Sequence, residues 1–397
     1  MGKFSKIKKT AILIFAIIFS LPSITFTATA ATADEIYQNN LKIHNNQATD
    51  QSVLEFYKLP SKNDYSKSDN KEIIDLAESI TKNITKGYDK VKAIHDWVAN
   101  NIWYDLDASE VTGLQDIDIF HNARFGLSVL KNKRGVCGGY TNLTVALLRA
   151  VGIPAKRIEG YAYMPNSAQF NPEIFYDLQN IKANHAWCEA FIDGRWIIID
   201  ITWDSKNRYK DGKYSEATSS TDKYFDISVE DISVSHKYIN YEFKLKDFDL
   251  SGVKKITIPK SVKNIDNWAF NEHTNLTAVT MHDNITSIGT SAFRGCGNLK
   301  DITIPNSVTS IGIAAFAYCE SITEMNIPES VISIGEKAFW GCTGMTAIMI
   351  PESVKIIGEN TFKYCEKLTI HGKKGSYAET YAKNNNIYFL SVTANNY

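Results

Sequence analysis

The chain has 397 residues, a formal net charge of −1 and 12% aromatic residues, and this length and composition support two well-packed domains. The near-neutral charge argues against nucleic acid or an anionic membrane surface as the main partner. The six cysteines show no zinc-ligand spacing, so we expect no bound metal and no cofactor.

The N-terminus has the pattern of an export signal. Lysines 3, 6, 8 and 9 precede an apolar run from Ala11 to Leu21, and small residues follow at Ala28-Thr29-Ala30. This pattern resembles a secretory signal peptide of a Gram-positive bacterium, which we assign to residues 1–33. We therefore expect a protein that is secreted or held non-covalently at the cell surface. An uncleaved membrane anchor is the alternative, because the apolar run is nearly long enough to span a bilayer.

A polar lead-in is expected after the signal peptide. Residues 34–70 are rich in Asn, Lys, Ser and Asp, a composition typical of exposed chain, with a helix considered only around Ser52–Tyr57. The first folded domain is predicted over residues 71–240.

A cysteine in a glycine-rich turn opens the most informative segment of this domain. Cys137 stands in Gly135-Val136-Cys137-Gly138-Gly139-Tyr140, and the leucines that follow recur at helical spacing until Gly152 and Pro154 end the pattern. The thiol is therefore expected at a helix N-terminus. Unpaired N–H groups and the helix dipole favour an anion at that position and lower a thiol pKa from its free value of ~8.5.

A histidine and an aspartate belong to a predicted hairpin. His185 begins an alternating run to Phe191, Asp193-Gly194 is a strong turn signal, and the return strand ends at Asp200. Antiparallel pairing across this turn can bring His185 and Asp200 together, so that the carboxylate orients the imidazole. Taken singly, the cysteine, the histidine and the aspartate each have an ordinary structural explanation.

Several motifs in one order resemble the bacterial transglutaminase-like (papain-like thiol) family across roughly residues 70–240. They are Ala93–Val98 and Asn101–Asp105, the Cys137 segment, Gly152–Ala155, His185–Glu189, Asp200–Asp204, and Lys223–Ser228 with His236. The resemblance implies an α+β papain-like fold with Cys137 as nucleophile, His185 as general base and acid, and Asp200 as the orienting carboxylate. It also makes the Trp103 indole and the Tyr104 hydroxyl candidate oxyanion donors beside the Cys137 backbone N–H.

The expected chemistry is thiolate attack on a carbonyl of a protein or peptide, giving a thioester that passes to water or to an amine. The first outcome describes a peptidase, amidase or deamidase, and the second a cross-linking acyltransferase. The sequence leaves both open. A peptidoglycan-acting enzyme and a surface adhesin with an inactive triad are further alternatives.

A repeat occupies the C-terminal part of the chain. Phenylalanines, isoleucines and cysteines each recur every 23 residues, for example at Phe270, Phe293, Phe316, Phe339 and Phe362. The period predicts a leucine-rich-repeat solenoid of short β-strands and turns, and the units resemble the BspA-type repeat of bacterial surface proteins. We predict a junction over 241–252, five repeats over 253–368 and a cap over 369–397. The repeat cysteines share one interior slot, which favours packed thiols over disulfides.

Each repeat is predicted to open with a strand whose outward residues form two ladders. This is the candidate binding face for a cell-envelope or host protein, with no nucleic-acid role expected. Its residues are Lys255, Ala278, Asp301, Glu324 and Ala347 in one ladder, and Thr257, Thr280, Thr303, Asn326 and Met349 in the other. The mixed charge of these positions does not name a partner.

Overall fold

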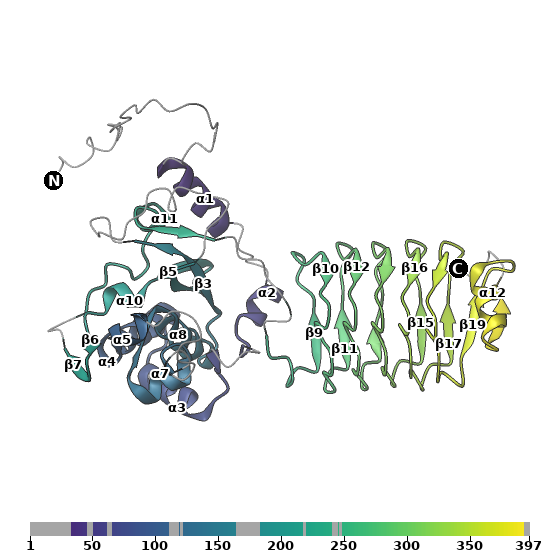
Figure 1. Cartoon of the computed structure of the whole chain (residues 1–397), viewed down its shortest axis with the longest axis horizontal. Coiled ribbons are helices and arrows are strands. Elements are labelled where there is room, and N and C mark those ends of the chain that lie inside the picture. Colours follow the sequence, from purple (N-terminus) through teal and green to yellow (C-terminus); the bar gives the residue numbers. More distant parts are fainter. Residues whose placement is uncertain are drawn as a thin grey trace.

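The computed structural model of the chain describes residues 33–45, 51–61, 66–110, 119, 122–163, 183–216, 220–239, 245 and 248–392. The predicted signal peptide lies outside the described residues except for Ala33. Figure 1 shows a part built of helices and sheets on the left and a row of short parallel strands on the right. Among the described residues, no helix is both long and apolar enough to cross a membrane.

Helix α8 (Cys137–Ala150) is the centre of the first domain. Its predicted apolar residues, Leu143, Leu147 and Leu148, are fully buried. They pack against α3 (Lys71–Thr81), α4 (Gly87–Asn101) and α7 (Gly126–Asn132). Gly152, with a φ of +77°, takes the left-handed conformation in the turn that follows α8.

An antiparallel sheet in the order β5-β4-β3-β8 carries most of the site. Its strands are β3 (Ala155–Ala162), β4 (His185–Ile192), β5 (Arg195–Ile199) and β8 (His236–Tyr238). Ile192 pairs with Arg195, and the two residues between them have φ values of +51° and +82°. Two left-handed residues are what a type I′ hairpin turn requires, so the predicted Asp193-Gly194 hairpin is confirmed.

The two faces of this sheet are covered by different helices. Cys188, Ile197 and Ile199 pack against the α8 layer, whereas Ile198 and Tyr238 face the opposite side. That side is covered by α11 (Val229–Ile232) and α1 (Ala33–Asn45). Alternation along the strands therefore buries both faces of the sheet.

The expectation of an exposed lead-in is wrong for α1. Ile36 and Asn40 of this helix are both 0% exposed, and α1 lies against β8 and α11. The mainly polar composition of the segment concealed the two positions that pack. Helix α2 (Gln51–Phe56) does form at the predicted helix.

A second small sheet adjoins the cysteine. Its order is β2-β1-β6-β7, with β1 (Trp103–Asp105), β2 (Arg134–Gly135), β6 (Arg208–Lys210) and β7 (Lys213–Ser215). Short α5 (Leu106–Glu110) follows β1, and short α10 (Ile201–Asp204) follows β5. Because β1 runs parallel to β2, its aromatic residues lie beside the chain that leads into Cys137.

The C-terminal domain is a solenoid in which equivalent residues of successive repeats pair in parallel. Ile265, Ile288, Ile311, Ile334 and Ile357 align in one row of strands. This row consists of β10 (Asn264–Ile265), β12 (Ser287–Ile288), β14 (Ser310–Ile311), β16 (Ser333–Ile334) and β18 (Ile356–Ile357). On the other side of each turn the strands form two sheets. The first holds β9 (Lys255–Thr257), β11 (Ala278–Thr280) and β13 (Asp301–Ile302), and the second begins with β15 (Glu324–Asn326) and β17 (Ala347–Met349).

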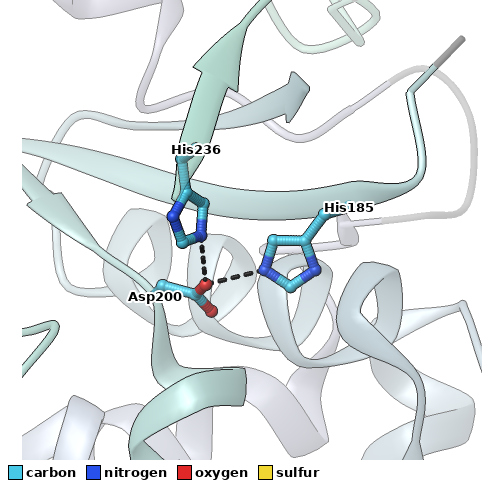
Figure 2. A group of neighbouring side chains, drawn as sticks. All are labelled: His185, Asp200 and His236. Atoms are coloured by element: carbon cyan, nitrogen blue, oxygen red, sulfur yellow. Dashed lines mark hydrogen bonds and ion pairs between the residues drawn. The ribbon is translucent and has the colours of Figure 1, made fainter. Parts of the chain in front are cut away.

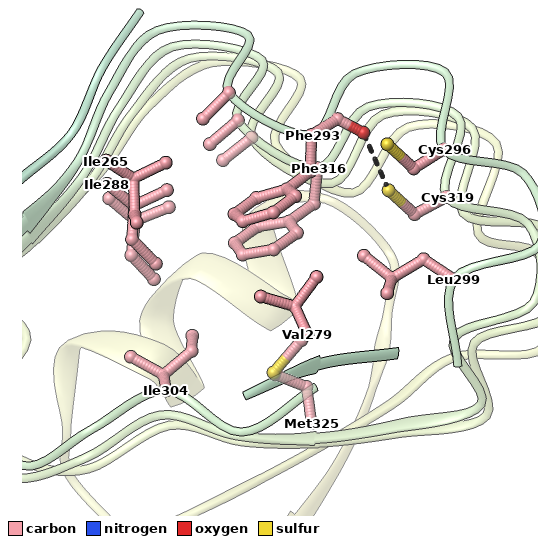
Figure 3. Packing of buried hydrophobic residues seen from close by; sticks show 14 of the residues in the cluster. Ile265, Val279, Ile288, Phe293, Cys296, Leu299, Ile304, Phe316, Cys319 and Met325 are labelled. Atoms are coloured by element: carbon pink, nitrogen blue, oxygen red, sulfur yellow. Dashed lines mark hydrogen bonds between the residues drawn. The ribbon is translucent and has the colours of Figure 1, made fainter. Parts of the chain in front are cut away.

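The solenoid core repeats one set of contacts in each turn (Figure 3). Successive phenylalanine rings stack nearly parallel, with Phe293 and Phe316 at 5.2 Å and Phe316 and Phe339 at 5.3 Å between centroids. Each repeat thiol donates to a phenylalanine carbonyl, as Cys319 Sγ does to Phe293 O at 3.1 Å. The four repeat cysteines are free and buried, so the prediction of packed thiols is confirmed.

The ends of the solenoid are both covered. At the C-terminal end, β19 (Thr369–Gly372), α12 (Tyr377–Asn384) and β20 (Tyr388–Ser391) pack on the last repeat. At the other end, Tyr57 forms edge contacts with Trp196 at 5.5 Å and with Phe248 at 5.6 Å. One apolar cluster therefore continues from the first domain into the repeats.

Candidate active site

Cys137 is the first residue of α8 and is partly exposed. The N–H of a first helical residue has no partner within its helix, so it is free to bind an anion. Burial raises the pKa of the Cys137 thiol, but the hydrogen bond and charge of His185 outweigh it, helped by the Ala186 backbone and the Arg157 charge. The net pKa is lowered, which favours the thiolate.

Gly139 has no room for a side chain, because the chain before α7 packs closely against it. A Cβ on Gly139 would lie 2.3 Å from the carbonyl oxygen of Ala123, which is shorter than any ordinary contact. The first turn of α8 is thus pressed against the chain that precedes α7. This contact fixes the direction in which the helix leaves Cys137.

His185 and Asp200 meet at the open end of the β4–β5 hairpin, as the turn predicts. His185 Nε2 lies 2.7 Å from Asp200 Oδ2, and its other ring nitrogen points away from the carboxylate (Figure 2). Burial lowers the pKa of His185, but the charge and hydrogen bond of Asp200, with the hydrogen bond to Cys137, raise it to about 10. The structure therefore joins His185 and Asp200 by a hydrogen bond, and the mutual pKa effects of Cys137 and His185 indicate that the thiol lies beside this pair.

Asp200 is fully buried, yet its carboxylate is well supplied with donors. Oδ1 accepts from the backbone N–H of Thr202 at 3.1 Å and of Trp203 at 3.4 Å, because Asp200 caps α10. Burial raises its pKa, but the charge and hydrogen bond of His185, followed by those of His236, hold the pKa well below the usual range. Asp200 is therefore an anion at neutral pH.

His236 is a neighbour that the sequence reasoning did not include in the site. Its Nε2 lies 3.0 Å from the same oxygen, Asp200 Oδ2, and the side chain is 0% exposed. The sequence placed His236 only in a motif after the main segment, and no spacing rule links it to Asp200. One ring nitrogen of each histidine and one carboxylate oxygen of Asp200 lie within 4.8 Å of one another, a spacing that would also fit a metal ion. The hydrogen bonds account for the arrangement, and the absence of a metal stays a prediction.

The two oxyanion candidates lie beside the cysteine segment in different ways. Trp103 pairs with Arg134 and Tyr104 with Gly135 across the parallel strands. The Trp103 indole N–H is buried and has no hydrogen-bond partner among the residues that the structure describes, and its ring packs edge-on against Tyr214 at 5.4 Å. Burial, and then the charge of Cys137, raise the pKa of Tyr104 to about 12, so its hydroxyl is protonated and close enough to sense the thiol.

A buried hydrogen-bond network holds the end of α10 in place, and its residues were not among the predicted site residues. Asp204, at the end of α10, accepts from Thr221 Oγ1 at 2.7 Å and from the Tyr224 backbone N–H at 3.1 Å. His95 of α4 reaches the same carboxylate, with Nε2 at 3.1 Å from Oδ2. His95 and Asp204 were visible in the sequence motifs, but nothing there paired them.

Two regions of the chain match protein-family models. The transglutaminase-like superfamily matches residues 74–201, and the BspA-type leucine-rich repeat region matches residues 242–369 in six copies. Residues 74–201 are a transglutaminase-like domain. The repeat region after it begins at residue 242, ahead of the five units counted from residue 253.

The relatives match the chain only in part. Mouse kyphoscoliosis peptidase is 24% identical over 131 residues, which are 33% of this chain and 18% of that protein. The chain thus spans less than a fifth of the length of this curated relative. A leucine-rich repeat protein of T. pallidum is 28% identical over 30% of this chain and 57% of its own, with a TM-score of 0.29. A leucine-rich cell surface protein of Faecalibacterium prausnitzii is 29% identical over 45% of this chain and 42% of its own, with a TM-score of 0.31.

The repeat ladders of the BspA-type region lie at the surface. Lys255, Asp301 and Glu324 are exposed, and Ala278 and Ala347 are half-buried. In the second ladder Thr257, Thr280, Thr303 and Asn326 are exposed, and Met349 is half-buried. The strand register places Lys255 beside Ala278, and Ala278 beside Asp301. A binding role for this face stays a prediction.

Proposed function

We propose that the transglutaminase-like domain is a thiol acyl-transfer enzyme with Cys137 as nucleophile. The observation that carries the proposal is the 2.7 Å contact between His185 Nε2 and the buried Asp200 carboxylate, with Cys137 at the start of α8 close enough for its pKa and that of His185 to depend on each other. The lowered pKa of the thiol and the raised pKa of the imidazole together favour a thiolate–imidazolium pair at neutral pH. Such a pair is the reactive form of a cysteine nucleophile.

In the proposed reaction the Cys137 sulfur attacks the carbonyl carbon of an amide, and the carbonyl π electrons move to oxygen. Collapse of this tetrahedral anion breaks the C–N bond, and His185 gives its proton to the leaving amine. A thioester on Cys137 remains. His185 then takes a proton from water or from an acceptor amine, which attacks the thioester and restores the thiol.

Two donors are proposed for the tetrahedral anion. One is the Cys137 backbone N–H at the start of α8, where the helix dipole also favours negative charge. The other is the Tyr104 hydroxyl, because its pKa responds to the charge on Cys137. The Trp103 indole is kept as the competing candidate, supported by its buried and unpaired N–H.

We also propose that the protein is secreted and that its repeats bind a partner. The lysine-rich start and the apolar run of residues 11–21 support secretion. The exposed ladders of the repeat region support binding to a protein or to the cell surface. In this scheme the repeats select where the thiol enzyme works.

The test is mass spectrometry of a dimethylated casein mixture incubated with the protein and a labelled primary amine. Cys137→Ala removes the nucleophile, and Cys188→Ala is the matched control because Cys188 is a fully buried thiol of β4 that donates to the Ile199 carbonyl oxygen. Amine incorporation that depends on Cys137 would establish a transglutaminase, and cleavage or deamidation that depends on it would establish a hydrolase. Identical spectra from wild type and Cys137→Ala would count against enzyme action on general protein substrates and would favour the adhesin.

A further inference from the structure

We propose that His236 is a positioning residue that holds the Asp200 carboxylate in the orientation His185 needs. The inference rests on the proposed function, because it assigns a role within the same site. It extends the series of three side chains to four, with two histidines on one carboxylate oxygen.

The contacts of His236 satisfy both of its ring nitrogens. Nε2 lies 3.0 Å from Asp200 Oδ2, and Nδ1 lies 2.9 Å from Ser235 Oγ. Figure 2 shows the two imidazoles approaching Asp200 from different strands, with His236 on β8 and His185 on β4. With the two backbone donors on Oδ1, the carboxylate has four N–H groups around it and no freedom to rotate without losing one.

The surroundings of His236 favour its neutral form. The titratable groups that face it are Asp200, His185 with ring centroids 5.4 Å apart, and Tyr224 at 6.0 Å. Uncharged groups also surround it: the rings of Trp187 on β4 and Trp203 on α10, and Ala162 of β3, which pairs with His236. Burial lowers the pKa of His236 more than Asp200 raises it. A neutral His236 then donates from Nε2 and accepts the Ser235 hydroxyl at Nδ1.

The backbone that carries His236 is fixed by α1. Asn40 Nδ2 donates to the His236 carbonyl oxygen at 2.9 Å, and Asn40 Oδ1 accepts from the Tyr238 N–H at 2.9 Å. The Asn40 amide therefore occupies the place of a neighbouring strand along β8, and it is 0% exposed. A ring held this firmly can act as a fixed donor rather than as a mobile base.

The consequence for the thiol follows from the role of Asp200. A fixed carboxylate keeps the His185 imidazolium in place beside Cys137, and that charge is what lowers the thiol pKa. Without the His236 donor the carboxylate can turn, and the imidazolium loses part of its fixed counter-charge. The thiol pKa should then move up towards the free value of ~8.5.

The experiment is the pH dependence of Cys137 alkylation by iodoacetamide, which needs no substrate. His236→Phe keeps a ring of similar size without a donor, and His236→Gln restores an uncharged N–H at a similar reach. We expect the acid limb of the rate profile to rise by about one pH unit in the Phe variant, the tenfold effect of a lost hydrogen bond to a charged group. The Gln variant should stay within a few tenths of a unit of wild type, since no charge on residue 236 is needed.

Each outcome bears on a different claim. A wild-type acid limb no lower than the free thiol value would refute the ion pair of the proposed function. A wild-type limb that is low, with an unchanged or lowered limb in the His236→Phe variant, would overturn the role of His236 alone. If circular dichroism shows that the Phe variant is unfolded, Ser235→Ala replaces it. That change frees Nδ1, and we expect a smaller upward shift; no shift would overturn the proposal.

Discussion

A buried ion pair joins strands β3 and β4 of the antiparallel sheet, and the free-energy cost of breaking it can be predicted. Glu189 of β4 is 0% exposed, and its carboxylate lies 3.2 Å from Lys156 Nζ, 2.7 Å from Tyr238 Oη and 3.0 Å from His44 Nδ1. Lys156 is itself 5% exposed in its side chain and lies over the Trp196 ring at 4.3 Å. Glu189→Gln removes the charge that compensates this ammonium and keeps a side chain of the same shape.

The magnitude follows from the pKa of Glu189. Burial raises that pKa, but the charge of Lys156, followed by the bonds to His44 and Tyr238, lowers it from 4.5 to about 2. At ~1.4 kcal/mol per pKa unit the difference is about 3 kcal/mol of folding stability. The loss of one partner from a buried pair typically costs ~3–5 kcal/mol, so the two routes agree. For Lys156, burial outweighs Glu189 and lowers the pKa, so its ammonium depends on the Glu189 charge for stabilisation.

The sign of the pH dependence is fixed by the lowered pKa. The contribution of Glu189 is complete above the unfolded carboxyl value of ~4.3 and is lost as the pH falls towards about 2. The assay is urea unfolding followed by tryptophan fluorescence at pH 7 and at pH 3. Wild type should lose stability between the two pH values by more than the Gln variant does.

The matched control for this prediction is the double variant Glu189→Gln with Lys156→Met. It has no uncompensated ammonium and keeps an apolar side chain against Trp196, so it should recover at least half of the lost stability. Equal unfolding midpoints for the single and the double variant would refute the reasoning, because the cost would then not come from an uncompensated lysine.

Three further predictions concern the repeats and the thiols. Phe316→Ala should lower the unfolding free energy of the solenoid by about 3–5 kcal/mol, since the ring is 0% exposed and stacks on both neighbours. The exposed Ile332→Ala should change it by less than about 0.5 kcal/mol, and equal effects would contradict the stacking argument. Iodoacetamide at pH 7 should label Cys137 first in the native protein, because burial raises the pKa of Cys319; peptide mapping that finds Cys319 labelled first would oppose this. Tyr104→Phe should lower turnover by about 10²-fold and leave the rate of Cys137 alkylation unchanged. If turnover instead falls by this amount in Trp103→Phe and not in Tyr104→Phe, the oxyanion donor is the Trp103 indole.

Local signals in the sequence were enough to predict the elements that bring His185 and Asp200 together. The Asp193-Gly194 turn fixes the register of β4 and β5, and the register fixes which strand ends meet. The glycines around Cys137 and the leucine spacing after it predict the start of α8. The solenoid could also be predicted from the sequence, because one repeat period specifies every strand and every interior position at once.

The contacts that sequence could not supply are those between segments with no shared pattern. Asn40 bonds to His236 across 196 residues of chain, and no spacing rule connects them. The polar surface of α1 made the segment resemble exposed chain, although two of its positions are fully buried. Composition averages over a helix, whereas packing depends on one face of it.

Strand β5 has the apolar cluster shared with the solenoid at one end and Asp200 at the other. Trp196, near the hairpin turn of β5, joins the cluster that continues into the solenoid, and Asp200 lies just past the other end of the same strand. Four residues of extended chain span about 13 Å, so the apolar cluster shared with the solenoid reaches the sheet at the end remote from the carboxylate. Asp200 is instead held by α10, His185 and His236, none of which belongs to the repeats. The repeats can therefore vary in their exposed ladder residues without disturbing the contacts of Asp200 with His185 and His236.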